Sequence, residues 1–175
     1  RVGVDKPQEF LHLMEIFNKY PLYELIVHPR VQKDYYDNTP DWDIFAEAVK
    51  MSRNPLCYNG DIFTVEDYRK FREVFPKVDR IMLGRGLLKN PMLAEEIKKD
   101  GNVFETDRKR IKAFHDRIYE DYKKVMWGEK NVLFKMKEFW VYTGEMFPEG
   151  EKYLKKIRKA SRLSDYDEAV NKLEF

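Results

Sequence analysis

The stretch PLCYNGDIFTVEDYRKF, residues 55–71, decides how this chain folds. It opens with a short apolar run that is typical of a strand, and Asn59-Gly60 taken alone favours a tight hairpin turn. A helix start follows instead, because Thr64 and Asp67 have the spacing of a capping box. The Asn-Gly pair therefore lies where a strand passes into a helix, at the C-terminal end of the strand.

The same alternation of strand and helix continues on both sides of this stretch. Residues 1–4 have the pattern of the end of a strand. Further strands are predicted over ELIVHPR and VDRIMLGRGLL, and further helices over PQEFLHLMEIFNKY, DWDIFAEAVKMS and PMLAEEI. Parallel strands need a crossover of this length, so the alternation predicts a parallel α/β sheet that binds its ligand at the C-terminal ends of the strands.

The pattern changes near GNVFETD, residues 101–107, where we expect a domain boundary. Beyond it, apolar residues recur at helical spacing in IKAFHDRIYEDYKKVMW, and FKMKEFWVYTGEMF and EKYLKKIRKAS continue as amphipathic segments. Ser164 and Asp167 offer a second capping box ahead of a final helix. The sequence thus predicts two domains, residues 1–100 and an all-α bundle over residues 101–175.

Composition narrows the classes of function. Lys and Arg together number 33 against 31 for Asp and Glu, so net charge alone does not indicate a polyanionic partner. The single cysteine, Cys57, excludes an intrachain disulfide framework and fits a reducing cytoplasm. No His/Cys/Asp/Glu spacing predicts a metal site, and charged residues interrupt every apolar run before it is long enough to cross a membrane. The chain opens abruptly on RVGVD without Met, so we expect an N-terminal portion to be missing.

Three predicted strand ends carry polar or glycine-rich groups. These are His28 and Arg30 in VHPR, Asn59, Gly60 and Asp61 in YNGD, and Gly84 and Arg85 in LGRG. Glycines let a phosphate approach backbone N–H groups, and an adjacent arginine adds charge-assisted donors. Each motif alone is also explained by a turn or a structural histidine. Their placement on successive strand ends favours a phosphate-binding site.

The lone cysteine and the aromatic residues of the helical region are interpreted as packing residues. Cys57 lies within the apolar run and is expected to be a small buried residue without a catalytic role. The aromatic residues Trp127, Phe139, Trp140 and Tyr142 of the helical region are expected to pack in its core.

The order VHPR, an aromatic eight residues after the histidine, DW, NGDI, MLGRG and KNP resembles the flavin-dependent tRNA-dihydrouridine synthases. The resemblance is strong over residues 1 to about 97 and extends weakly to the end. It implies the second half of a (β/α)8 TIM barrel followed by a helical tRNA-binding domain. It also implies reduction of the C5–C6 double bond of uridine in tRNA, with FMN as cofactor and NADPH as reductant. No protein partner is inferred.

The same resemblance assigns roles to particular residues. The expected FMN ligands are His28, Asn59, Gly60, Asp61, Gly84 and Arg85. Arg1 and Tyr36, with Arg30, would bind the target uracil. The proton-donating cysteine of the family is expected in the missing N-terminal half, so these 175 residues alone would be inactive. A half barrel exposes sheet edges, so we also expect this chain alone to be poorly soluble or to pair with another half.

Two other functions are compatible with the residues. One is another FMN- or phosphate-binding TIM-barrel oxidoreductase, since a fold does not fix a reaction. The other is a non-catalytic RNA-binding fragment that acts through its helical tail. The candidate RNA contacts in that tail are Lys135, Lys137, Lys155, Lys156, Arg158 and Lys159, although an ordinary solvated helix face also explains them.

Overall fold

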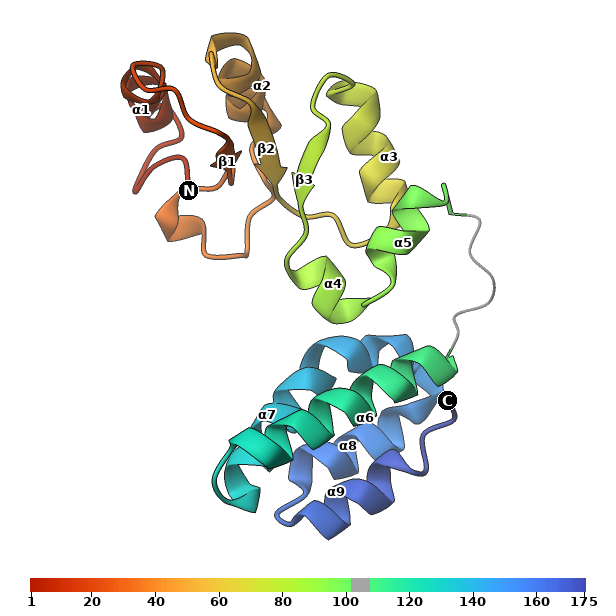
Figure 1. Ribbon diagram of the computed structural model, residues 1–175. Helices are drawn as coiled ribbons and strands as arrows, with labels where there is room; N and C mark the ends of the chain where they lie inside the picture. The colour runs from red at the N-terminus through yellow and green to blue at the C-terminus, as the bar shows by residue number, and fades with distance from the viewer. Residues whose placement is uncertain (102–107) are drawn as a thin grey trace. The chain divides into compact units, whose positions relative to one another are not determined.

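A computed structural model describes residues 1–101 and 108–175 and divides the chain into two compact units (Figure 1). The first unit is Arg1–Gly86 and the second is Leu87–Phe175. The boundary predicted at residues 101–107 falls almost entirely outside the described residues.

The first unit is a three-stranded parallel sheet with its helices between the strands in sequence. Its elements are α1 Glu9–Phe17, β1 Leu25–Val27, α2 Trp42–Met51, β2 Leu56–Asn59, α3 Val65–Val74 and β3 Arg80–Met82, and α4 Arg85–Lys89 begins at its end. The strands lie side by side in chain order (Figure 1). The α/β class is confirmed, and so is the capping box of Thr64 and Asp67 at α3. The strand predicted over VDRIMLGRGLL is wrong in its second half, because β3 ends at Met82 and Arg85–Lys89 form α4.

The first four residues, which were predicted to end a strand, form only a single β-bridge. A single parallel bridge joins Gly3 to Val31, and the Val2 N–H donates to the carbonyl of Arg30 at 3.1 Å. The segment is therefore extended and runs beside the residues that follow β1, but its pairing is too short to count as a strand.

One face of the sheet is packed under helices. Val27 is aligned with Tyr58 across β1 and β2, and both are buried. Tyr58 stacks on Phe71 of α3 with ring centroids 4.2 Å apart and meets Phe45 of α2 edge-on at 4.9 Å. Because side chains alternate along a strand, the neighbouring residues face the other way. On that opposite face, Ile26 is 50% exposed.

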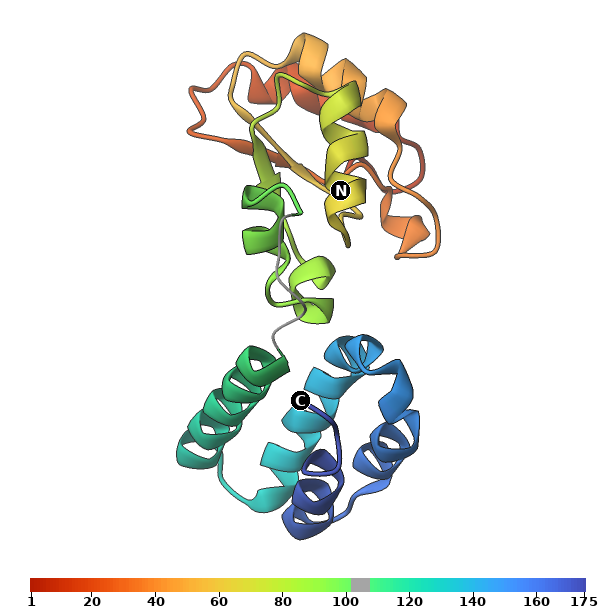
Figure 2. The same cartoon turned by 90° about the vertical axis from the view of Figure 1, so that its right-hand side faces the viewer.

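The second unit is helical. Besides most of α4 it contains α5 Leu93–Lys98, α6 Arg108–Val125, α7 Glu129–Thr143, α8 Glu151–Lys159 and α9 Leu163–Val170. Helix α7 contacts α6, α8 and α9, and Figure 2 shows these three helices beside it. The core includes the buried residues Met136, Trp140, Phe147 and Tyr166. The predicted helical character of this region is confirmed.

Two predictions for this unit are wrong. Helix α9 already begins at Leu163, so Ser164 lies within its first turn and cannot cap it, and the preceding Arg162 makes no side-chain cap. Trp127 is 94% exposed, because α6 ends at Val125 and the turn through Gly128, with φ of 83°, holds the indole outside the core. Trp140 is buried as predicted.

Candidate functional site at the strand ends

The parallel sheet brings the three predicted strand ends to one edge. His28 directly follows β1, Asn59 is the last residue of β2, and Gly84 lies two residues after β3. The Asn59 side-chain amide donates to the carbonyl of Met82 at 2.9 Å, which fixes β2 against β3 at this edge. The amide of Asn59 therefore has a structural partner within the sheet.

Asp61 joins two arginines from different parts of this edge. The Arg30 guanidinium makes a bidentate pair with the Asp61 carboxylate, with Nη1 2.9 Å from Oδ1 and Nη2 also in contact with Oδ2. Arg85 Nη2 donates to Asp61 Oδ1 at 2.7 Å. Burial disfavours ionisation of Asp61, but the Arg30 hydrogen bond and the charges of both arginines outweigh it and lower its pKa. Asp61 is thus an anion that orients two cations.

Arg30 occupies a different environment from the one expected of a substrate contact. It is only 2% exposed, and its Nε donates to the carbonyl of Asn38 while its terminal nitrogens hold Asp61. The hydrogen bond to Asp61 raises its pKa further. The buried guanidinium of Arg30 therefore orients Asp61. The predicted contact of Arg30 with the uracil stays a prediction.

Tyr36 presents an aromatic ring beside these cations. Tyr36 is 58% exposed. The guanidinium carbon of Arg85 lies 4.1 Å from the centroid of its ring, and the guanidinium carbon of Arg1 lies 5.2 Å from the same centroid. Arg1 is anchored in turn by donating to the carbonyls of Val31, at 3.1 Å, and Tyr35. Both distances are within the range of cation–π contacts, which favour this position of the ring.

His28 has a buried nitrogen without a partner. Its Nδ1 makes no hydrogen bond within the part of the chain that the structure describes. Burial, followed by the charges of Arg1 and Arg30, lowers the pKa of His28 to about 4. The imidazole is therefore neutral at neutral pH and can donate or accept one hydrogen bond to a bound molecule.

The two glycines of the site differ in what surrounds them. A Cβ at Gly60 would collide with the ring and hydroxyl of Tyr58, so this glycine is required by packing. A Cβ at Gly84 would meet no atom within 4 Å. The backbone at Gly84 is therefore open to an approaching ligand group, as expected for a phosphate-binding loop.

Sequence reasoning missed one member of this cluster. The Arg85 guanidinium carbon lies 5.4 Å from the centroid of Phe63, two residues beyond Asp61. An aromatic residue two positions after the NGD motif was the available signal. Cys57 is 5% exposed with a pKa raised by burial, which agrees with the packing role expected for it.

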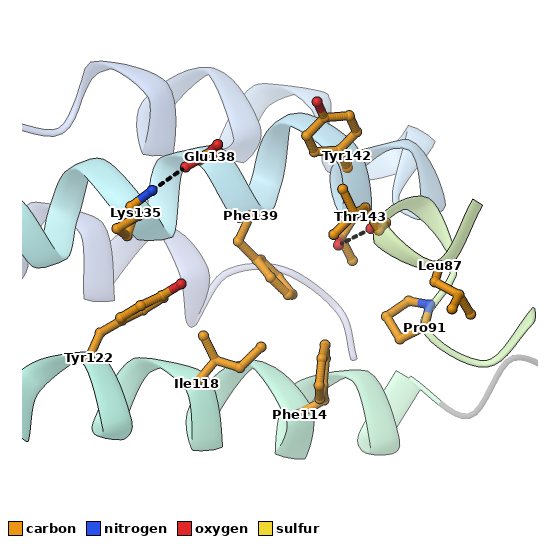
Figure 3. Close-up of a pocket in the computed structure, with 11 residues that line it drawn as sticks. Leu87, Pro91, Phe114, Ile118, Tyr122, Lys135, Glu138, Phe139, Tyr142 and Thr143 are labelled. Atoms are coloured by element: carbon orange, nitrogen blue, oxygen red, sulfur yellow. Dashed lines mark hydrogen bonds and ion pairs between the residues drawn. The ribbon is translucent and has the colours of Figure 1, made fainter. Parts of the chain in front are cut away.

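Helix α6 and helix α7 enclose an apolar cleft of about 330 Å³ in the second unit. Figure 3 shows Phe114, Ile118 and Phe139 pointing into it from the two helices. The two charged residues at its edge, Lys135 and Glu138, pair with each other at 3.0 Å. The cleft therefore offers apolar contact but no unsatisfied charge for a ligand.

No group of three or more His, Cys, Asp or Glu side chains in residues 1–101 and 108–175 is arranged to hold a metal ion. Among the same residues, no helix combines the length and the apolar character needed to cross a membrane.

The fold and the strand-end cluster define an α/β class of protein that has two arginines paired with one carboxylate at its strand ends and a second, helical unit. The chain belongs to the dihydrouridine synthase family, whose model matches residues 1–174. Members of this family are oxidoreductases that act on tRNA. The resemblance inferred from the motifs is confirmed.

Several curated relatives agree with this assignment. The tRNA-dihydrouridine(16) synthase of Pseudomonas putida is 34% identical over 107 residues, which cover 60% of this chain and 33% of the relative. That of Pseudomonas syringae pv. tomato is 39% identical over 42% of this chain and 23% of its own length. That of Vibrio parahaemolyticus is 21% identical over 98% of this chain and 52% of its own length. The chain thus spans between about a quarter and about half of these relatives.

Proposed function

We propose that this chain contributes the flavin-binding edge and the tRNA-binding helices of an FMN-dependent tRNA-dihydrouridine synthase, with NADPH as the reductant. The observation that carries the proposal is the cluster of His28, Asp61, Arg85 and Tyr36 at one edge of the parallel sheet. The proposed domains are residues 1–100 for the flavin and 101–175 for the RNA.

The residues at this edge fit a flavin mononucleotide. Gly84 leaves open space beside the backbone, and Arg85 supplies a guanidinium next to it for a phosphate. Arg85 is held by Asp61, so it need not be ordered when a ligand binds. His28 has a buried nitrogen that a polar atom of the flavin would satisfy. A bound flavin supplies the hydride that reduces the uracil double bond.

The protein groups proposed to meet the uracil are Tyr36 and Arg1. An exposed ring held by two guanidinium groups is suited to contact a base that has left its stack. Such a base must be extruded, because a stacked uracil cannot present its ring to the flavin. Asp61 and Arg30 are proposed to act indirectly: Arg30 orients Asp61, and Asp61 orients Arg85.

The parallel sheet is also what half of a (β/α)8 barrel would contain. Its strands follow chain order without a reversal, and helices cover one face while Ile26 and Met82 lie half exposed on the other. In a closed barrel that second face would be the interior. This arrangement supports the proposal that residues 1–100 belong to the second half of such a barrel.

Uridine 16 is the first position to assay. Most of the relatives compared carry this position in their names, among them the proteins of Pseudomonas putida and Vibrio parahaemolyticus. The proposal is that the complete protein acts on the same region of tRNA.

The test uses the protein encoded by the complete gene. The purified protein is expected to show flavin absorbance and to form dihydrouridine in tRNA from a strain that lacks the modification. Arg85→Gln should lower the bound flavin severalfold, because it removes the guanidinium beside Gly84. Arg53→Gln, a change of the same type at an exposed site away from the cluster, should not. A colourless protein without affinity for FMN would overturn the proposal.

A further inference from the structure

Helix α7 and the end of α8 form a basic groove that is separate from the apolar cleft. The groove has a volume of about 700 Å³. Its lining residues, which define the α7–α8 groove, are Lys130, Asn131, Leu133, Phe134, Lys137, Lys159, Ala160 and Ser161. Three of these eight carry a positive charge and none carries a negative one.

The three lysines of the groove have no counterion among the described residues. Lys130, Lys137 and Lys159 make no ion pair within residues 1–101 and 108–175. By contrast, Lys135 pairs with Glu138 on the same helix at 3.0 Å. Lys155 likewise lies 3.7 Å from Glu151. An unneutralised cluster of cations attracts a polyanion more strongly than paired charges do.

The same groove carries an exposed aromatic ring. Phe134 is 67% exposed and lies four residues after Lys130 and three before Lys137, so the three share one face of α7. At the turn that precedes α7, Trp127 is 94% exposed. Phe134 thus places an exposed ring between two lysines without ion pairs on one face of α7.

Cations interleaved with exposed aromatic rings fit single-stranded RNA. Lysines neutralise phosphates along a backbone, and aromatic rings stack on bases whose faces are free. A duplex offers the phosphates but keeps its base faces covered. An acidic protein segment would use the lysines but gain little from Phe134.

We propose that the α7–α8 groove binds an unpaired stretch of tRNA, with Lys130, Lys137 and Lys159 on phosphates and Phe134 stacked on a base. This inference rests on the proposed function for its choice of RNA. It adds the surface that holds the RNA and the single-stranded form in which the RNA is held there.

The experiment measures RNA affinity of the complete protein over a range of salt concentrations. Replacement of Lys130, Lys137 and Lys159 by Gln should weaken tRNA binding and reduce the slope of log K against log salt by about 2, since each contact to a single strand contributes about 0.7. Phe134→Ala should weaken binding about tenfold at unchanged slope. A single-stranded oligonucleotide should bind more tightly than a duplex of the same length.

Matched controls lie on the same helices. Lys135→Gln and Lys155→Gln remove the same charge from paired lysines and should leave the salt slope nearly unchanged. Flavin content and the circular dichroism spectrum show whether each variant remains folded.

Two results would overturn the inference. One is a triple lysine variant that binds tRNA as the unaltered protein does. The other is an acidic peptide such as polyglutamate that competes as well as RNA, together with no effect of Phe134→Ala. The proposed function can fail separately from this inference. If the unaltered protein binds no flavin but binds RNA, and the variants lose that RNA binding, the proposed function is overturned and this inference stands.

Discussion

At the scale of single residues, Asp61 shows what the sequence could and could not predict. Its place at the end of a strand follows from the NGD motif and the alternation of elements. Its role does not, because the two arginines that hold its carboxylate are 31 and 24 residues away in the chain. A carboxylate bound by both Arg30 and Arg85 is suited to orient cations, whereas a free carboxylate would repel a phosphate.

The glycines of the site give a paired prediction. Gly60→Ala should lower the free energy of unfolding by about 1–3 kcal/mol, because the new methyl group collides with the buried ring of Tyr58. Gly84→Ala should change it by less than about 0.5 kcal/mol, since its methyl group enters open space. Urea denaturation of both variants measures the difference.

The amount of bound flavin should distinguish the two glycine variants in the opposite way to stability, with the larger loss in Gly84→Ala. Gly84→Ala should reduce the FMN retained on purification, because the methyl group occupies the space assigned to the ligand. Equal stability losses in the two variants, or full flavin retention in Gly84→Ala, would contradict these assignments.

At the scale of elements, local patterns predicted helices better than their ends. Thr64 and Asp67 form a capping box, whereas Ser164 and Asp167, with the same spacing, do not. The difference is that Leu163 already has helical geometry and places Ser164 inside the helix. Spacing of three residues is therefore necessary for the motif, but the residue where the helix begins decides whether it forms.

Helix α6 carries a buried histidine that no sequence pattern indicated. His115 is 2% exposed, and its Nε2 lies 2.6 Å from the Tyr166 hydroxyl of α9. Its Nδ1 lies 2.9 Å from Asp116. Burial lowers the pKa of His115, although the hydrogen bond to Asp116 opposes this.

Stability of the helical unit should therefore depend on pH. The unfolded chain takes up a proton on His115 near its ordinary pKa of about 6.5, while the folded state resists it. The stabilising contribution is thus complete above about pH 6.5 and is lost as the pH falls below that value. Urea denaturation at pH 7.5 and pH 5 should show the loss.

The control for this pH dependence is an exposed histidine. His115→Gln should be less stable at pH 7.5 but should lose less stability between the two pH values than the unaltered protein. His12→Gln, whose side chain is 78% exposed, should follow the unaltered protein. An unchanged pH dependence in His115→Gln would exclude this histidine as its source.

At the scale of the whole molecule, the alternation of strands and helices was enough to predict the α/β class and the helical region. The pairing of surface charges was not predictable. Six basic residues of the tail were equal candidates for RNA in the sequence, yet three of them, Lys135, Lys155 and Arg158, have glutamate partners. Lys130, which lines the groove, was overlooked because it lies at the start of α7.

The barrel proposal predicts unequal costs for two exposed apolar residues. Met82 is 47% exposed on the open face of the sheet, and Val74 is 55% exposed at the end of α3. In the complete protein, Met82→Gln should cost about 1–3 kcal/mol of unfolding free energy, because that face would be a barrel interior. Val74→Gln should cost less than about 0.5 kcal/mol. Chemical denaturation of both variants in the complete protein would show whether the open face is covered.

The position of Trp127 also has a spectroscopic consequence. Of the three tryptophans, Trp140 is 3% exposed and Trp42 donates from its ring to the Tyr58 hydroxyl at 3.0 Å, whereas Trp127 is 94% exposed at the turn before α7. Emission at long wavelength, and quenching by iodide, will therefore come chiefly from the indole at that turn. The carbonyl of Trp127 accepts a hydrogen bond from Asn131, which lines the α7–α8 groove, so we expect RNA bound in the groove to alter the emission of this indole and to be detected without an added label.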